Sequence, residues 1–361
     1  MDRTGALLIA EAGVNHNGSL DCALQLVDAA AAAGADIIKF QTFRANRIVG
    51  VAAPKATYQL AATGSEQSQY EMLKALELDE GMHLKLASRC AELGIEFLST
   101  PFDLESLRLL VDTVGIKRIK FGSGEITNGP LLLAAARTRK PLILSTGMST
   151  LSEIESALSV LAFGYASGSC TSISRDAFDA AYASSDGRRT LQELVTLLHC
   201  TTEYPAPDVD VNLGAMDTMS AAFGLPVGYS DHTKGMAISL AAVARGASVL
   251  EKHFTLSRNM PGPDHKASLE PDEFRELVLN IRRISAAIGD GRKVPAPSEM
   301  ANKQIARKSL VARVPIAAGE AFTEENLGAK RPGDGLSPMD YWALIGRTAV
   351  RDFGPDEMIE T

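Results

Sequence analysis

The sequence predicts an α/β fold in which eight parallel strands close into a (β/α)₈ TIM barrel, followed by a small, mostly irregular and β domain. Short apolar runs alternate eight times with Ala- and Leu-rich amphipathic stretches. Strand, helix, strand at this spacing indicates parallel strands covered by helices. The 361 residues, 45% of them hydrophobic, suffice for one large and one small domain. A doubly wound open sheet is the alternative, which the lack of G-x-G-x-x-G after the first strand only mildly disfavours.

The eight apolar runs are the predicted strands, and they cover residues 6–11, 36–41, 96–100, 118–123, 142–145, 194–200, 226–230 and 248–253. Amphipathic stretches predict helices over residues 20–33, 104–111, 154–161, 237–244 and 271–288. We therefore expect a catalytic barrel over residues 1–290, a linker over 291–303 and a second domain over 304–361. The linker follows from the Pro-containing stretch 293–298, and the tail has turn residues without helical periodicity.

One segment departs from the alternation of strands and helices. Residues 164–189 are rich in Ser, Ala and Gly and precede a predicted strand. A segment before a strand lies on the face opposite the carboxyl ends of the strands. We expect a variable excursion there, without a catalytic part.

Charge and cysteine content exclude several classes of protein. The net charge of −8 and pI near 5.4 argue against a nucleic-acid or anionic-membrane partner, although a local basic pocket for a small anion stays open. The four cysteines form no C-x-x-C pair, and the first residues lack the apolar run of a signal peptide. No segment approaches the roughly 18 to 20 apolar residues of a membrane helix. These features favour a reduced, cytoplasmic protein.

Two histidines suggest a metal site. His232 and His253 end neighbouring predicted strands, at the rim where a barrel keeps its chemistry. Adjacent strands lie about 4.8 Å apart, so both imidazoles could reach one divalent ion. Glu251 faces the same way as His253 and could orient a ligand or add one. Imidazole and oxygen ligands would suit Mn²⁺, Mg²⁺, Zn²⁺ or Fe²⁺.

The other histidines carry less information. His16 and His199 also lie near the ends of predicted strands, and each could be a polar rim residue or a packed one. His83 falls in a helix-like stretch, where a structural role is expected.

A cluster of lysines and hydroxyl side chains at the same rim predicts an anion site. Lys39 and Gln41 share one face of the second strand, and Lys120 is followed by Ser123 at the end of the fourth. The third and fifth strands end in Ser99-Thr100 and Ser145-Thr146. Together these groups would form a cradle for phosphate and carboxylate. Glu11, at the end of the first strand, could position water or transfer a proton, or could simply cap a loop.

Nine segments carry a resemblance to a known family. They read IAEAGVNHNG (9–18), IKFQT (38–42), KFGSGE (120–125), LSTGM (144–148), HCTTEYP (199–205), YSDHT (229–233), EKHFT (251–255), GPDHKAS (262–268) and KRPGDG (330–335). As an ordered set they resemble the bacterial sialic acid synthase family. The last segment resembles that family's antifreeze-like (SAF) domain.

The resemblance implies condensation of phosphoenolpyruvate with an N-acylated amino sugar aldehyde, giving a nine-carbon 2-keto acid and phosphate. It implies phosphoenolpyruvate contacts from Lys39, Thr100, Lys120, Ser123, Ser145, Ser230 and His253, and from Thr202, where some members carry Asn. It implies sugar contacts from Gln41, Glu125, Tyr204, Asp264 and Arg331. His232 and His253 would hold the metal, most commonly Mn²⁺, with Mg²⁺ or Co²⁺ as substitutes, and Glu11 would assist the water and proton steps. A homodimer with swapped tail domains is also implied, with Arg331 reaching the partner's sugar.

Several functions stay open at this point. N-acetylmannosamine, giving N-acetylneuraminate, is the favoured substrate. A 2,4-diacetamido-2,4,6-trideoxy hexose, giving N,N'-diacetyllegionaminate, is the alternative. A Schiff-base aldolase could use Lys39, Lys120 or Lys252, whereas an amidohydrolase would want a His-x-His pair that the first strand lacks. The tail could instead be an ice-binding or interaction module on an inert barrel.

Overall fold

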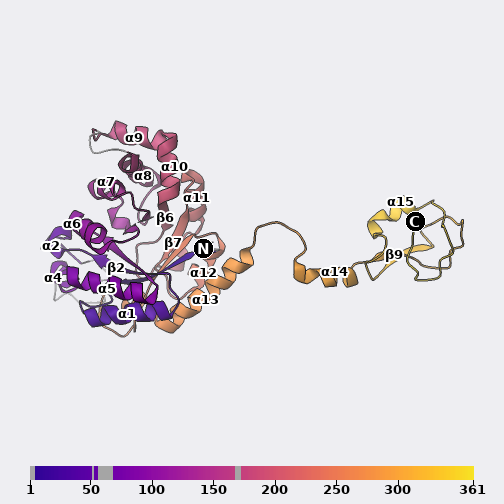
Figure 1. Ribbon diagram of the computed structural model, residues 1–361, viewed down its shortest axis with the longest axis horizontal. Helices are drawn as coiled ribbons and strands as arrows, with labels where there is room; N and C mark the ends of the chain where they lie inside the picture. Colours follow the sequence, from indigo (N-terminus) through magenta and orange to yellow (C-terminus); the bar gives the residue numbers. More distant parts are fainter. Residues whose placement is uncertain (1–4, 51–52, 56–67, 167–171) are drawn as a thin grey trace. The chain divides into compact units, whose positions relative to one another are not determined.

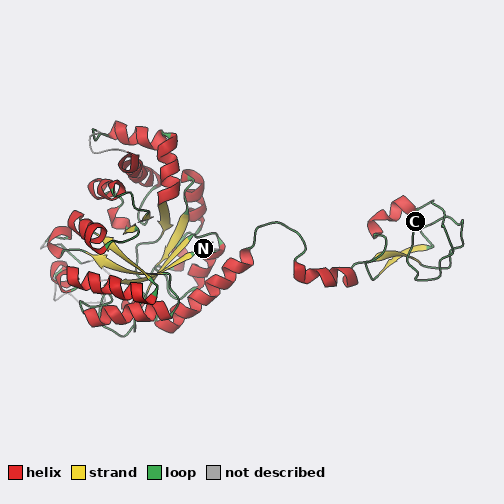
Figure 2. Cartoon of the chain, viewed as in Figure 1, coloured by secondary structure: helices red, strands yellow, loops and turns green. Residues whose placement is uncertain are grey.

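The computed structural model describes residues 5–50, 53–55, 68–166 and 172–361, and the chain divides into two compact units, Met1–Gly289 and Asp290–Thr361. In the first unit the strands lie in the middle and the helices surround them (Figures 1 and 2). Among the described residues, no helix combines the length and the apolar composition that crossing a bilayer requires.

The eight strands of the first unit form one parallel sheet. They are β1 (Leu7–Gly13), β2 (Ile37–Thr42), β3 (Glu96–Pro101), β4 (Ile119–Phe121), β5 (Leu142–Ser145), β6 (Val195–His199), β7 (Val227–Asp231) and β8 (Val249–His253). The hydrogen-bonded order runs β3-β2-β1-β8-β7-β6-β5-β4, and β3 and β4 lie in contact with each other. The pairing of β1 with β8 brings the two ends of the repeat together. The predicted barrel is therefore confirmed, and the open-sheet alternative is wrong.

Helices and short turns join the strands. The α-helices are α1 (Leu20–Ala32), α2 (Ala45–Ile48), α4 (Gln69–Ala75), α5 (Glu80–Leu93), α6 (Leu104–Arg108), α7 (Gly129–Arg137), α8 (Leu151–Ala166), α9 (Arg175–Ala183), α10 (Ser185–Leu194), α11 (Gly214–Phe223), α12 (Ala237–Ala244) and α13 (Pro271–Ile288). A π-helical turn, Leu109–Val114, extends α6. The predicted strands and the helices α1, α12 and α13 match the structure to within about two residues.

The expected excursion over residues 164–189 is largely helical. It contains the end of α8, all of α9 and the start of α10, and these three helices pack on one another. Its serines act as helix caps: Ser174 accepts a hydrogen bond from the Ala177 amide, and Ser184 accepts one from the Gly187 amide. Residues 167–171 of this segment lie outside the described residues. None of its described residues lines the cavity at the carboxyl ends of the strands.

The inside of the barrel has an apolar layer beneath a polar one. The apolar layer is a cluster of one side chain from each of six strands: Ile9, Ile37, Leu98, Ile143, Leu198 and Val249. Two residues further along each strand, on the same face, come Glu11, Lys39, Thr100, Ser145, Cys200 and Glu251. The apolar layer closes the barrel and provides a floor for the polar layer, which faces the open end.

The second unit contains a small antiparallel sheet. Strands β9 (Ser309–Ala312) and β10 (Leu327–Lys330) pair, and α15 (Tyr341–Leu344) lies in the same unit. A core of its own includes Leu310, Phe322 and Phe353. A short helix, α14 (Met300–Ala306), begins within the predicted linker, residues 291–303. Met, Ala, Lys and Gln, which have high helix propensity, make up most of this short helix.

Candidate active site

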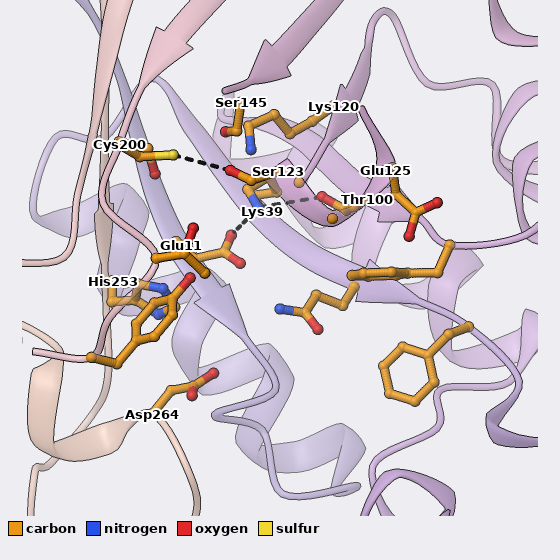
Figure 3. Close-up of a pocket in the computed structure, with 18 of the residues that line it drawn as sticks. Glu11, Lys39, Thr100, Lys120, Ser123, Glu125, Ser145, Cys200, His253 and Asp264 are labelled. Carbon is orange, nitrogen blue, oxygen red and sulfur yellow. Dashed lines mark hydrogen bonds and ion pairs between the residues drawn. The ribbon is translucent and has the colours of Figure 1, made fainter. Parts of the chain in front are cut away.

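A cavity of about 380 Å³ opens at the carboxyl ends of the barrel strands. Every predicted site residue of the first unit lines it: Glu11, Lys39, Gln41, Thr100, Lys120, Ser123, Glu125, Ser145, Thr202, Tyr204, Ser230, His232, Glu251, His253 and Asp264. Figure 3 shows ten of the lining residues labelled around the cavity. Residues spread over more than 250 positions of the sequence thus meet at one place.

Two lysines and two glutamates form a buried network on the cavity floor. Lys39 Nζ lies 2.6 Å from Glu11 Oε2 and 3.5 Å from Glu251 Oε2, and Lys120 Nζ lies 3.3 Å from Glu251 Oε1. The strand register explains the first contact, because Glu11 is paired with Lys39 across β1 and β2. Ser230 donates to Glu251 at 2.8 Å, and Lys39 donates to Thr100 at 3.3 Å. The floor therefore carries two lysine side chains that a bound anion could approach.

Burial and ion pairing give the carboxyl groups of Glu11 and Glu251 very different pKa values. Burial raises the pKa of Glu11 to about 7, against the lowering influence of Lys39. Burial also raises the pKa of Glu251, but Lys120 and Lys39 together bring that pKa well below its usual value. At neutral pH, Glu251 is therefore a permanent anion, and Glu11 can both take and give a proton. This property suits a general base or acid.

A second side of the floor consists of hydroxyl groups, and the Gly147 backbone lies directly behind them. The Gly147 amide donates to Ser123 Oγ at 2.9 Å, and Ser123 Oγ lies 3.1 Å from Cys200 Sγ. A Cβ at Gly147 would lie 2.4 Å from Thr202 Oγ1, so only glycine lets these side chains converge here. Hydroxyls beside two lysines form a set of donors suited to phosphate or carboxylate oxygens.

His232 and His253 lie side by side, with ring centroids 5.5 Å apart. His232 Nδ1 donates to the Thr201 carbonyl at 2.6 Å, so Nε2 is its unprotonated nitrogen, and Ser230 Oγ lies 3.3 Å from that Nε2. Burial lowers the pKa of both imidazoles, that of His232 to about 4, so both are neutral. His253 Nδ1 is buried without a hydrogen-bond partner.

These properties fit a divalent cation held by two neutral imidazoles. No group of three or more His, Cys, Asp or Glu side chains arranged as metal ligands occurs in the described part of the chain. Further ligands would therefore come from water or substrate, which leaves coordination positions open to a reactant. The donor set does not select one metal among those that bind imidazole.

The predicted sugar contacts surround the space above this floor. Tyr204 packs against both imidazoles, with its ring centroid 4.3 Å from that of His232. Asn128 donates to Glu125 at 2.7 Å and fixes its carboxylate. Burial raises the pKa of Asp264 to about 6. Gly13, with φ of +52°, leaves room for Glu11, Gln41 and Asp264, since a Cβ there would lie 3.2 to 3.7 Å from all three.

Three other histidines of the first unit do not line the cavity. His16 and His83 are fully buried, and His83 bonds Thr42 and the Asp79 carbonyl, as expected of a structural residue. His199 Nε2 bonds the Val211 carbonyl at 2.6 Å. Arg331 belongs to the second unit, where its Nε donates to the Ala306 carbonyl, so its sugar contact stays a prediction.

The structure adds lining residues that the sequence did not identify. Cys200 reaches the floor two positions after Leu198, and this alternation was a signal that could have identified it. An apolar wall is formed by Phe43, Ile48, Val49, Leu73 and Phe102. Its members come from separate loops and short helices, and no local sequence pattern connects them.

Comparison with known proteins identifies this arrangement. Residues 26–293 match the model of the NeuB family, and residues 307–361 match the model of the SAF domain. The chain belongs to the NeuB family. The resemblance found in the sequence is thereby confirmed, as is the prediction of an enzyme of the transferase class.

Three relatives of this NeuB-family chain are informative. N,N'-diacetyllegionaminic acid synthase of Campylobacter jejuni is 50% identical over 98% of both chains. The Legionella pneumophila protein of the same name is 43% identical over 94% of this chain and 89% of its own. The crystal structure of N-acetylneuraminic acid (sialic acid) synthetase from Leptospira borgpetersenii, in complex with citrate, is 34% identical, with a TM-score of 0.66 over 82% of this chain and 90% of that one.

Proposed function

We propose that this protein condenses phosphoenolpyruvate with a 2,4-diacetamido-2,4,6-trideoxy hexose to give N,N'-diacetyllegionaminate and phosphate. The 50% identity to the Campylobacter jejuni synthase, end to end in both chains, is the observation that favours this substrate. N-acetylmannosamine, favoured from the sequence alone, has weaker support, since the sialic acid synthetase is 34% identical. The cavity floor supports the phosphoenolpyruvate part of the proposal.

The reaction joins C3 of phosphoenolpyruvate to the aldehyde carbon of the open-chain sugar. The aldehyde oxygen takes up a proton and becomes a hydroxyl, while positive charge develops at C2 of the phosphoenolpyruvate part. Water adds at C2 and loses a proton. The resulting tetrahedral centre collapses to a ketone: the bond from C2 to the phosphate oxygen breaks, and the remaining proton of the C2 hydroxyl passes to the departing phosphate, so atoms and charge balance with hydrogen phosphate as leaving group.

Charged residues of the floor match the needs of these steps. Lys39 and Lys120 would bind the phosphate and carboxylate of phosphoenolpyruvate, with Thr100, Ser123, Ser145, Thr202 and Ser230 donating hydrogen bonds. Glu11, with a pKa near 7, would accept the proton of the attacking water. A divalent cation held by His232 and His253 would act as a Lewis acid toward the aldehyde oxygen. Mn²⁺ is our expectation for that cation.

A direct comparison of substrates tests the proposal. Purified protein is incubated with Mn²⁺, phosphoenolpyruvate and either sugar, and phosphate release and product mass are followed. We expect kcat/KM to be higher for the diacetamido sugar, and a chelator to abolish turnover. Higher kcat/KM for N-acetylmannosamine would overturn the substrate assignment. Turnover that survives the chelator, with borohydride trapping of pyruvate on a lysine, would instead indicate a Schiff-base aldolase.

A further inference from the structure

The cavity changes character between its floor and its mouth. The floor carries lysines, carboxylates and hydroxyls, whereas the apolar wall consists of Phe43, Ile48, Val49, Leu73 and Phe102. Phe43 and Phe102 follow β2 and β3, Ile48 and Val49 lie at the end of α2, and Leu73 lies in α4. Four of these five side chains are only partly buried, so they present apolar surface to the cavity.

The apolar wall is fixed in place by its own packing. Phe43 and Phe102 meet edge to face, with centroids 6.0 Å apart, and the wall packs on the buried Met72 and Leu76. Glu77, which follows α4, accepts a hydrogen bond from the Ala45 amide at 2.8 Å and so connects α4 to α2. The wall is thus a built surface and not a set of side chains left exposed by chance.

The position of the reacting groups decides which part of the sugar meets this wall. Glu11 and the two imidazoles lie on the floor, so the aldehyde end of the sugar must lie there too. The other end, C4 to C6, then points toward the mouth. In N-acetylmannosamine that end carries hydroxyls, and a hydroxyl buried without a partner costs about 1–3 kcal/mol. An acetyl methyl and a C6 methyl would instead gain about 25 cal/mol for each Å² of apolar surface buried.

We propose that the apolar wall is the subsite that selects the sugar, by receiving its 4-acetamido methyl and its C6 methyl. Gln69, on the same side of the cavity, offers a side-chain amide that can pair with the polar part of the acetamido group. This inference rests on the proposed function. It adds that discrimination between the two sugars resides in residues of α2, α4 and the loops after β2 and β3.

Two substitutions that nearly preserve side-chain volume test the apolar wall without leaving a void in it. Val49→Thr replaces one methyl by a hydroxyl, and Leu73→Gln places an amide on the wall. Each is expected to lower the ratio of kcat/KM values, diacetamido sugar over N-acetylmannosamine, by about 10-fold or more, as one group in an apolar pocket is worth about 10- to 200-fold. The KM for phosphoenolpyruvate should not change, because the floor is intact.

Matched controls use the same substitutions away from the cavity. Val209→Thr and Leu84→Gln alter side chains that are 90% and 43% exposed, and the ratio should stay at its wild-type value. Thermal melting of each variant shows whether it is folded. An unchanged ratio in folded Val49→Thr and Leu73→Gln, or an equal loss for both sugars, overturns the subsite while the proposed function stands. Wild-type protein that turns over neither sugar overturns both.

Discussion

Two buried groups of lysines and carboxylates lie on opposite faces of the barrel sheet and meet at neighbouring residues of β8, and they differ in what surrounds them. Glu251 points into the barrel, where it joins Lys39, Lys120 and Glu11 beside an open cavity. Lys252, the next residue, points outward and pairs with Asp231 at 2.9 Å. Both groups are almost inaccessible to solvent. Burial alone therefore does not separate a reactive group from a structural one.

The outer pair is satisfied within the protein. Lys252 also donates to the Thr233 carbonyl at 2.6 Å, and Asp231 also accepts from the Thr233 amide, the Thr233 hydroxyl and the Ser239 hydroxyl. No further ligand is needed there, and Lys252 does not line the cavity. The inner group instead faces space that a substrate could fill. A buried ion pair whose hydrogen bonds are all made within the protein has a structural role. A buried ion pair that borders a cavity can also contact a substrate.

The largest expected effect is on activity and comes from the inner group. Glu11→Gln keeps the shape of the side chain and removes its base, so kcat should fall about 10²- to 10⁴-fold. Stability should change little, because the pKa near 7 means that the neutral form is already well populated at pH 7. Steady-state kinetics and thermal melting measure the two quantities. A variant with a clearly lowered melting temperature but an unchanged kcat of the folded enzyme would reverse the assignment of the two groups.

The outer group should show the opposite pattern. Lys252→Met leaves Asp231 buried without its cation, which should lower the free energy of unfolding by about 3–5 kcal/mol. Urea denaturation measures this, and activity is normalised to the folded fraction. The KM for phosphoenolpyruvate of the folded enzyme should stay close to the wild-type value. A large rise in that KM with normal stability would place Lys252 in the binding site after all.

A pH profile sharpens the comparison further. If ionised Glu11 is the base, kcat/KM should fall about 10-fold per pH unit below an apparent pKa near 7. Stability should move in the opposite direction: between pH 4.5 and 7 the folded state holds a proton that the unfolded state has released, so this contribution decreases as pH rises. Glu11→Gln should remove the limb at pH 7 from the residual activity. A limb that persists there would belong to another group.

The sequence predicted the inner group well and the outer one poorly, for a physical reason. Polar residues at the ends of apolar strands point to a barrel rim, and Glu11, Lys39 and Lys120 were found in this way. Alternation also places Lys252 on the outer face, yet its partner Asp231 lies on another strand, and strand order is a tertiary property. The sequence alone therefore leaves Lys252 a candidate for Schiff-base chemistry, whereas in the structure Lys252 is held in an ion pair with Asp231.

The residues at the mouth of the cavity could not be predicted from the sequence either, because they also depend on tertiary contacts. The members of the apolar wall belong to α2, α4 and loops, where an apolar residue such as Leu73 is indistinguishable from a core residue. The helices α9 and α10 were missed because Ser, Asp and Gly, frequent in loops, here lie at helix starts. The sequence thus predicts features that repeat along one helix or strand, but it does not predict contacts between separate helices, strands and loops.

The smallest expected effect comes from a matched pair of serines. Ser230 donates to Glu251 in the inner group at 2.8 Å, and Ser239 donates to Asp231 in the outer group. Changing either to Ala removes one hydrogen bond to a buried carboxylate, which should cost about 1–3 kcal/mol of stability. Only Ser230→Ala should also raise the KM for phosphoenolpyruvate, by several-fold, because only that hydroxyl lines the cavity. If both variants raised this KM equally, the outer group would be acting through the position of His232, and the division between the two faces of β8 would fail.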